Sequence, residues 1–246
     1  MDIEVTLVFT PQITNYYHFL KDFCAQLHYE LTEREILNSK LRLHIVNHPN
    51  QIRKFYHAFT TLFDNIEYSF EKLENPDIAL KFDYFNKYEA IRKFRFDAAA
   101  TLDLFTYSKQ HILLIEREGY TDRYKEEHAK RSLENHLELK EEIEKLHHDL
   151  VFRSVRLSEM EFGEQAGLFY NAKVVIGQHG AGLLNLLWML PETHLIEIGH
   201  AFQGGVKRNM FRKLSNEFNI NYIHSNPIKN NVADIDDIMA KLKNIL

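Results

Sequence analysis

The sequence predicts an α/β protein with two parallel-sheet units, on three observations. Short runs rich in Val, Ile and Leu alternate with stretches whose apolar residues recur at helical spacing, a pattern typical of parallel sheets covered by helices. A long helical stretch at residues 86–107 divides this alternation in two, which places a domain boundary near Ser108. The 246 residues are 45% hydrophobic and 26% charged, a composition that supports a folded core.

The first half of the chain alternates strand and helix signals. Strands are predicted at residues 3–9, 42–47, 66–70 and 78–82. Residues 15–31 carry aromatic and aliphatic side chains at helical spacing and predict the first helix. A second helix is predicted at residues 49–63, which begin with a proline, and residues 86–107 form either one long helix or two.

The second half shows a clearer alternation. Strands are predicted at residues 111–116, 150–156, 173–177, 194–198 and 220–224. Helices are predicted at residues 124–148, 160–171, 181–190, 206–218 and 234–246. Ser158 is the predicted cap of the second of these helices, because a hydroxyl accepts from the N–H groups at a helix start. Pro191 ends the third, because proline cannot continue a helix.

Charge and cysteine content exclude several classes of protein. A net charge of −5, with Lys and Arg spread along the chain, does not indicate the basic face of a nucleic-acid-binding protein. The one cysteine, Cys24, cannot form an intramolecular disulfide and is interpreted as a small buried hydrophobe. No signal-peptide pattern and no run of about 18 apolar residues is present. We therefore expect a cytoplasmic protein with no membrane span and no nucleic-acid partner.

The strongest local signal is the segment KVVIGQHGAGLLNLLWMLPE, in which a strand runs into a glycine turn and an apolar helix. The turn at residues 177–185 has a geometry that binds phosphate, because unpaired N–H groups and the helix dipole face it. Gly180 and Gly182 let a ligand approach the backbone and allow positive φ. His179 can donate to a phosphate oxygen, and Asn185, one turn into the helix, can reach back toward it.

The same segment also has a plainer interpretation as a tight turn whose glycines only allow close packing of helix on sheet. It does not match GxGxxG, it lacks the Lys-Ser/Thr pair of a P-loop, and it contains no GxSxG. The charged residues near this segment therefore help to decide between a phosphate site and a packing turn.

Charged residues follow two nearby predicted strands. Glu197 ends strand 194–198, at the edge where parallel sheets bind ligands, and can accept from ribose hydroxyls. Arg117 and Arg123 flank a glycine turn after strand 111–116, and their planar forks suit a pyrophosphate. The alternatives are a solvated charge at Glu197 and surface ion pairs at the arginines. Residues 164–165 are interpreted as a helix face.

A histidine and an aspartate follow the first predicted strand in NYYHFLKDF. His18 and Asp22 are four residues apart on the predicted helix and therefore share a face. This spacing allows Asp22 to orient His18, or the two side chains to make separate contacts, and a histidine here can take a proton from an acceptor hydroxyl. The alternative is a partly buried helix residue with no chemical role.

Metal-binding patterns are missing from the sequence. It contains no HExxH, no set of cysteines and no clear DxD between strands. The acidic run at residues 234–237 lies at the start of the last predicted helix, where negative charge is stabilising. We expect no divalent metal and no cofactor.

Three segments resemble glycosyltransferase family 61: NYYHFLKDF, IEREGYTDR, and EMEFGEQAGLFYNAKVVIGQHGAGLLNLLWMLPETHLIEIG, the last being the most specific. The family includes plant and viral xylosyltransferases and O-linked N-acetylglucosamine transferases. In the middle segment the basic residues are spaced more loosely than in the family, which weakens the assignment of Arg123.

The resemblance implies a B-type glycosyltransferase fold, in which two Rossmann-like domains face each other across a cleft. The domains would be residues 1–108 on the acceptor side and residues 109–230 on the nucleotide-sugar side. Residues 231–246 would form a closing helix that packs back on the first domain.

The resemblance further implies inverting, metal-independent transfer of a sugar from a UDP-sugar to a glycan hydroxyl. Xylose is the first expectation for the sugar and N-acetylglucosamine the second, in a bacterial or viral enzyme. His18 would be the base, with Asp22 as the alternative. The donor would be held by Arg117, Arg123, His179, Gly180, Ala181, Gly182, Asn185 and Glu197.

Two other classes of function remain open. A non-catalytic nucleotide-sugar or glycan-binding module would bind UDP without sugar transfer. A nucleotide-dependent oxidoreductase is disfavoured by the missing GxGxxG.

Overall fold

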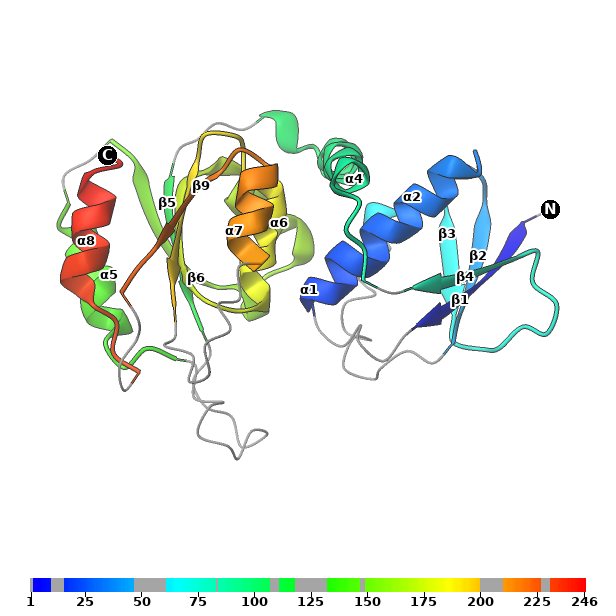
Figure 1. Ribbon diagram of the computed structural model, residues 1–246, viewed down its shortest axis with the longest axis horizontal. Coiled ribbons are helices and arrows are strands. Elements are labelled where there is room, and N and C mark those ends of the chain that lie inside the picture. The colour runs from blue at the N-terminus through cyan, green and yellow to red at the C-terminus, as the bar shows by residue number, and fades with distance from the viewer. Residues whose placement is uncertain are drawn as a thin grey trace. The chain divides into compact units, whose positions relative to one another are not determined.

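The computed structural model contains two compact units, Met1–Phe105 and Thr106–Leu246, each built on its own parallel sheet (Figure 1). The structure describes residues 2–9, 16–46, 61–82, 84–106, 111–117, 132–146, 149–199, 210–226 and 231–246. The α/β class expected from the alternating pattern is confirmed. The division between the units falls at Phe105, against a predicted boundary near Ser108.

The first unit has a four-stranded parallel sheet in the order β3-β2-β1-β4. Its strands are β1 (Ile3–Phe9), β2 (Leu41–Val46), β3 (Ile66–Ser69) and β4 (Ile78–Phe82). Alternate residues of the central strands, such as Val5 and Leu43, are fully buried, because one face of the sheet carries the core. The predicted helix at residues 49–63 lies almost entirely outside the described residues, which resume at Thr61.

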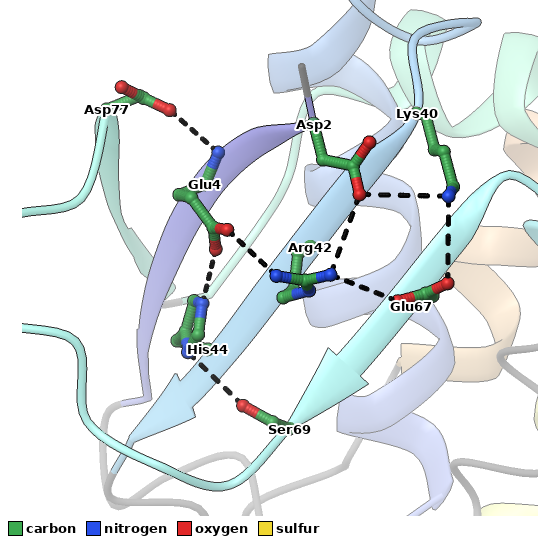
Figure 2. A network of polar contacts seen from close by, with 8 residues as sticks. All are labelled: Asp2, Glu4, Lys40, Arg42, His44, Glu67, Ser69 and Asp77. Carbon is green, nitrogen blue, oxygen red and sulfur yellow. Dashed lines mark hydrogen bonds and ion pairs between the residues drawn. The ribbon is translucent and has the colours of Figure 1, made fainter.

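Opposite charges line the other face of this sheet (Figure 2). Arg42 lies in register with Glu4 on β1 and Glu67 on β3, and its guanidinium pairs with both carboxylates at 3.2 and 3.6 Å. Glu4 also bonds Nε2 of His44 at 2.6 Å, and His44 contacts the Ser69 hydroxyl through Nδ1 at 3.2 Å. Cross-strand pairs of this kind each contribute roughly 0.2–1 kcal/mol and help to fix the register of β1, β2 and β3.

The helix predicted at residues 15–31 is present but is not a regular α-helix. It runs through α1 (Tyr16–His18), a π-helical segment η1 (Phe19–Cys24) and α2 (Ala25–Glu33). All six residues of η1 are buried. Helical spacing cannot reveal a π segment, because its wider turn is stabilised by tertiary contacts rather than by propensity.

Helix α4 (Tyr88–Thr101) packs against α2 and is followed by a 3₁₀ turn, η3 (Leu104–Thr106). This agrees with the two-piece version of the prediction for residues 86–107. No helix in the described part of the chain is long and apolar enough to cross a membrane.

The second unit has a five-stranded parallel sheet in the order β6-β5-β7-β8-β9. Its strands are β5 (His111–Glu116), β6 (Val151–Arg156), β7 (Ala172–Gln178), β8 (His194–Ile198) and β9 (Asn221–His224). Helices α5 (His136–Glu144) and α8 (Ile235–Lys243) lie on one side of this sheet, and α6 (Phe162–Asn171) and α7 (Met210–Glu217) lie on the other (Figure 1). The sheet is therefore covered on both faces, as an all-parallel sheet requires.

The closing helix packs within the second unit, and its predicted contact with the first domain stays a prediction. Ile238 and Leu242 of α8 are fully buried in a cluster with Ile143 of α5 and Ile112 of β5, so α8 belongs to the core of the second unit. The Asn135 amide ties the start of α5 to residue 233, just before α8, by accepting from its N–H and donating to its carbonyl, each at 2.9 Å. The helix buries its apolar stripe on the nearest apolar surface of its own unit.

Three local predictions in the second unit are corrected. The segment predicted as an α-helix at residues 181–190 is a 3₁₀ helix, η6 (Ala181–Trp188). Helix α6 is capped by Glu161 and Glu164 in a reciprocal capping box, whereas Ser158 lies in a separate 3₁₀ turn, η5 (Leu157–Glu159). Of the long helix predicted at residues 124–148, residues 124–131 and 147–148 lie outside the described residues, and the rest is helical only at α5.

Candidate functional site

The residues expected to hold a donor gather at the carboxyl edge of the second sheet. Arg117 follows β5, His179 and Gly180 follow β7, and Glu197 lies near the end of β8. The strands are parallel and in register, with Ile115 opposite Gly177 and Gly177 opposite Glu197, so these residues meet at one edge. Ligands of open α/β sheets bind at this edge.

Arg117 covers the glycine turn. Its Nη1 donates a hydrogen bond to the carbonyl oxygen of His179 at 2.7 Å. A Cβ atom on Gly180 would lie 2.6 Å from the same nitrogen, so the missing side chain at Gly180 lets the guanidinium approach the backbone. The expected positive φ is not used: Gly180 has φ 166° and ψ 172°, which is extended backbone.

Gly182 and Ala181 start the 3₁₀ helix that follows the turn. A Cβ on Gly182 would lie 3.0 Å from Cδ1 of Leu157, so this glycine makes room for a side chain of the protein. The Leu183 N–H already donates to the Gly180 carbonyl at 3.0 Å. Leu157 therefore occupies the space beside Gly182, and a ligand contact at this glycine stays a prediction.

His179 and Glu197 form a buried pair. Nδ1 of His179 hydrogen-bonds Oε1 of Glu197, and Oε2 of Glu197 accepts from the hydroxyl of Tyr222 at 2.6 Å. Glu197 is 2% exposed. Both of its oxygens are thus engaged by the protein, which places Glu197 to orient His179, and the ribose contact expected from the sequence stays a prediction.

Tyr222 completes this arrangement and was not identified from the sequence. Burial, reinforced by the Glu197 carboxylate, raises the pKa of the Tyr222 hydroxyl far above its ordinary value. The hydroxyl therefore stays protonated and donates to Glu197 at neutral pH. The Arg212 guanidinium lies 5.3 Å from the centre of the Tyr222 ring. The available signal was the alternation of strand 220–224, which puts Tyr222 and His224 on one face.

A second glycine of this edge is also covered by a side chain. A Cβ on Gly199, just after β8, would overlap the imidazole of His224, which ends β9. The Phe211 ring of α7 lies edge-on to His179, with centroids 5.2 Å apart. The edge is thus lined by Arg117, His179 and His224, a set rich in nitrogen donors.

The Asn185 side chain reaches back to the turn and bonds protein groups there and on α6. Its side chain is fully buried, and its Nδ2 donates to Oε1 of Gln165 at 3.1 Å and to the Gly182 carbonyl at 3.2 Å. Its Oδ1 accepts from the Trp188 indole at 3.2 Å. Gln165, expected on a helix face, also donates to the carbonyls of residues 157 and 160. Asn185 and Gln165 therefore hold η6 against α6.

The first unit brings His18 and Asp22 together as the spacing predicted. Nδ1 of His18 lies 2.6 Å from Oδ2 of Asp22. Oδ1 of the fully buried Asp22 accepts from the Lys21 ammonium and from the Phe85 N–H, the latter at 2.8 Å. Lys21 also donates to the Phe85 carbonyl at 2.6 Å. The geometry favours the interpretation in which Asp22 orients His18.

Arg123 lies outside the described residues, so its role stays a prediction. Among the described residues, no group of three or more His, Cys, Asp and Glu side chains is arranged to hold a metal ion.

The second unit is an α/β unit with a parallel sheet, and a glycine turn and an arginine at its carboxyl edge form a candidate ligand site. Residues 16–196 match the family model described as Glycosyltransferase 61, well over half of the chain, and the protein belongs to that family. The family resemblance drawn from the sequence is confirmed.

One relative illustrates the family. The chain is 33% identical over 89 residues to Beta-1,2-xylosyltransferase RCN11 of Oryza sativa subsp. japonica. The match covers 36% of this chain and 16% of the rice protein, so the chain corresponds to a small part of that relative.

Proposed function

We propose that this protein is an inverting glycosyltransferase that moves a sugar from a UDP-sugar to a glycan hydroxyl. Family membership supports the reaction class. Xylose is the first candidate for the sugar, supported by the name of the rice relative, and N-acetylglucosamine is the second.

The observation that carries the donor half of the proposal is the closure of Arg117 over the turn at His179 and Gly180. An arginine has five N–H donors in a planar fork, a shape that matches phosphate oxygens. A diphosphate bound at this turn would meet the guanidinium, the backbone N–H groups and the His179 ring. Because Glu197 holds Nδ1, His179 would contact the diphosphate through Nε2.

The acceptor half of the proposal places His18 as general base. In a single displacement, the acceptor oxygen forms a bond to the anomeric carbon while the bond from that carbon to the diphosphate breaks. The acceptor proton passes to His18, and the carboxylate of Asp22 at 2.6 Å stabilises the imidazolium that results. The negative charge that develops on the leaving UDP is stabilised by Arg117 and the turn.

We further propose that the reaction needs no divalent metal, with Arg117 and the turn supplying the positive charge. The B-type arrangement of the two units and the role of Arg123 stay predictions from the family resemblance.

A binding panel followed by a transfer assay tests this function. Thermal shifts would be measured with UDP, UDP-xylose, UDP-N-acetylglucosamine, GDP-mannose and ADP-glucose, each with and without EDTA. We expect shifts with UDP compounds alone, unchanged by EDTA, and glycan-dependent release of UDP with inversion read from the anomeric proton by NMR.

Each contrary result has a distinct meaning. No shift with any nucleotide contradicts the donor assignment, and a shift abolished by EDTA contradicts metal independence. UDP binding with neither transfer nor donor hydrolysis would favour a non-catalytic binding module.

A further inference from the structure

Tyr84 is an exposed aromatic residue that lies directly beside His18. Tyr84 is 57% exposed, whereas most aromatic residues in the described part of the first unit are buried or half-buried. The centroids of the Tyr84 and His18 rings are 5.5 Å apart, with an angle of 50° between the ring planes. A single exposed aromatic ring is ordinary on a protein surface, but this one is distinguished by its position next to the candidate base His18.

The two residues reach this position from neighbouring strands. β1 and β4 are adjacent and parallel, with Phe9 opposite Phe82 at their last residues. His18 lies on the helix that follows β1, and Tyr84 lies two residues after β4 ends. Both therefore lie at the carboxyl edge of the first sheet, the edge at which parallel sheets bind ligands.

The backbone beneath Tyr84 is firmly held. The next residue, Phe85, is buried, donates its N–H to Asp22 at 2.8 Å and accepts from Lys21 at 2.6 Å. The same Asp22 carboxylate bonds His18. One buried network thus holds both the His18 imidazole and the backbone next to Tyr84. The Tyr84 ring is therefore exposed on a backbone segment that is held in place.

A tyrosine ring in this setting suits a pyranose. The ring combines an apolar face with a polar hydroxyl, and a sugar likewise has an apolar C–H face and a rim of hydroxyls. A sugar stacked on Tyr84 would direct a rim hydroxyl toward the neighbouring His18. We propose that Tyr84 is the stacking platform for the acceptor sugar, an inference that rests on the proposed function.

Kinetics of Tyr84→Ala, Tyr84→Phe and Phe96→Ala test the platform, with the donor and acceptor found in the transfer assay. Tyr84→Ala should raise the acceptor KM about tenfold, which corresponds to about 1.4 kcal/mol, and leave kcat and the donor KM within about twofold. Tyr84→Phe keeps the ring and should resemble the wild type. Phe96 is 64% exposed in the same unit and serves as the matched control, with no expected effect.

The kinetic outcomes separate the platform from a structural role. A fall in kcat with an unchanged acceptor KM would mean that Tyr84 acts by supporting His18, and would overturn the platform. An acceptor KM that rises equally in Phe96→Ala would overturn it as well.

A binding measurement keeps the inference distinct from the proposed function. Saturation-transfer NMR with methyl glycosides of xylose, mannose and N-acetylglucosamine would compare wild type, Tyr84→Ala and Tyr84→Phe. If the wild type transfers no sugar but binds a glycoside, and only Tyr84→Ala loses that binding, the proposed function fails while the platform stands. Equal binding by all three proteins, or none by the wild type, would overturn the platform.

Discussion

The guanidinium of Arg117 closes over Gly180 and donates to the backbone carbonyl of His179 at 2.7 Å. This contact links the end of β5 to the end of β7 across the sheet edge. Arg117 is thereby held in place before any ligand arrives, so little side-chain entropy remains to be lost on binding a diphosphate.

Replacing Arg117 should weaken donor binding. A hydrogen bond to a charged group contributes about 1.5–3 kcal/mol, so Arg117→Ala should raise the Kd for UDP by roughly 10- to 100-fold. Calorimetry with UDP measures this change, and Arg117→Lys should recover only part of the affinity because an ammonium lacks the planar fork. Lys145→Ala, at an exposed lysine paired with Glu142, is the control. Equal Kd values for Arg117→Ala and wild type would remove Arg117 from the donor site.

Adding one methyl group at Gly180 should act through Arg117. In Gly180→Ala the new Cβ would lie 2.6 Å from Nη1 and 2.9 Å from Cζ of Arg117, so the guanidinium must move. The displaced atoms end a flexible side chain and the backbone is extended, so we expect a small change in Tm but weaker UDP binding.

A double-mutant cycle shows whether that effect passes through Arg117. The combined variant Arg117→Ala/Gly180→Ala should bind UDP no more weakly than Arg117→Ala alone, because the group that the methyl displaces is already gone. If the losses of UDP binding free energy in the two single variants add up in the double variant, Gly180 contacts the ligand independently of Arg117.

His18 and Asp22 should differ in what their replacement changes. His18→Gln should lower kcat by about 10²–10⁴-fold, the usual contribution of a general base, while leaving the UDP Kd and the Tm near wild type. Wild-type turnover in His18→Gln would exclude His18 as the base.

Replacing Asp22 should instead destabilise the fold. Asp22→Asn leaves the buried Lys21 ammonium without its carboxylate, and breaking a buried pair costs about 3–5 kcal/mol. A large drop in Tm for Asp22→Asn, together with little change in Tm for His18→Gln, would show that Asp22 stabilises the fold whereas His18 does not. An unchanged Tm in Asp22→Asn would contradict this division.

Acidification should destabilise the protein through buried histidines. Burial lowers the pKa of His28, His111 and His136 below their ordinary value of 6.5. On lowering the pH, the unfolded chain takes up protons first, so the stabilisation is complete above pH 6.5 and is lost as pH falls through the lower folded pKa values. Urea unfolding midpoints between pH 8 and pH 5 should therefore decrease with decreasing pH.

A variant of His111 tests whether this histidine contributes to the pH dependence of the urea midpoint. Its Nε2 bonds the Leu168 carbonyl at 2.8 Å, so a glutamine amide can replace the hydrogen bond without titrating. His111→Gln should show a shallower fall in midpoint between pH 6.5 and pH 5 than the wild type. Parallel curves for the two proteins would exclude His111 as a contributor.

The features predicted correctly from the sequence depend on short spacings. The bounds of strands 3–9, 111–116 and 194–198 follow from apolar runs between turn signals. The pairing of His18 with Asp22 follows from a separation of four residues, which survives the change to π geometry at Phe19. These predictions required no knowledge of distant contacts.

The features missed depend on contacts between distant segments. Nothing in the strand of Glu197 shows that its second oxygen accepts a hydrogen bond from Tyr222 of the next strand. The side-chain partner of Asn185, Gln165, lies on a different helix and was not identified from the sequence either. The docking of α8 likewise depends on the apolar face that α5 leaves open, which local periodicity does not reveal.

The docking of α8 on α5 has a consequence for dissecting the protein. The cluster around Ile112, Ile143, Ile238 and Leu242 belongs wholly to the second unit, so a fragment of residues 106–246 retains all the described strands and helices of this sheet. We expect this fragment to fold as a separate module, in which nucleotide binding can be measured or exchanged between relatives without the half that carries His18.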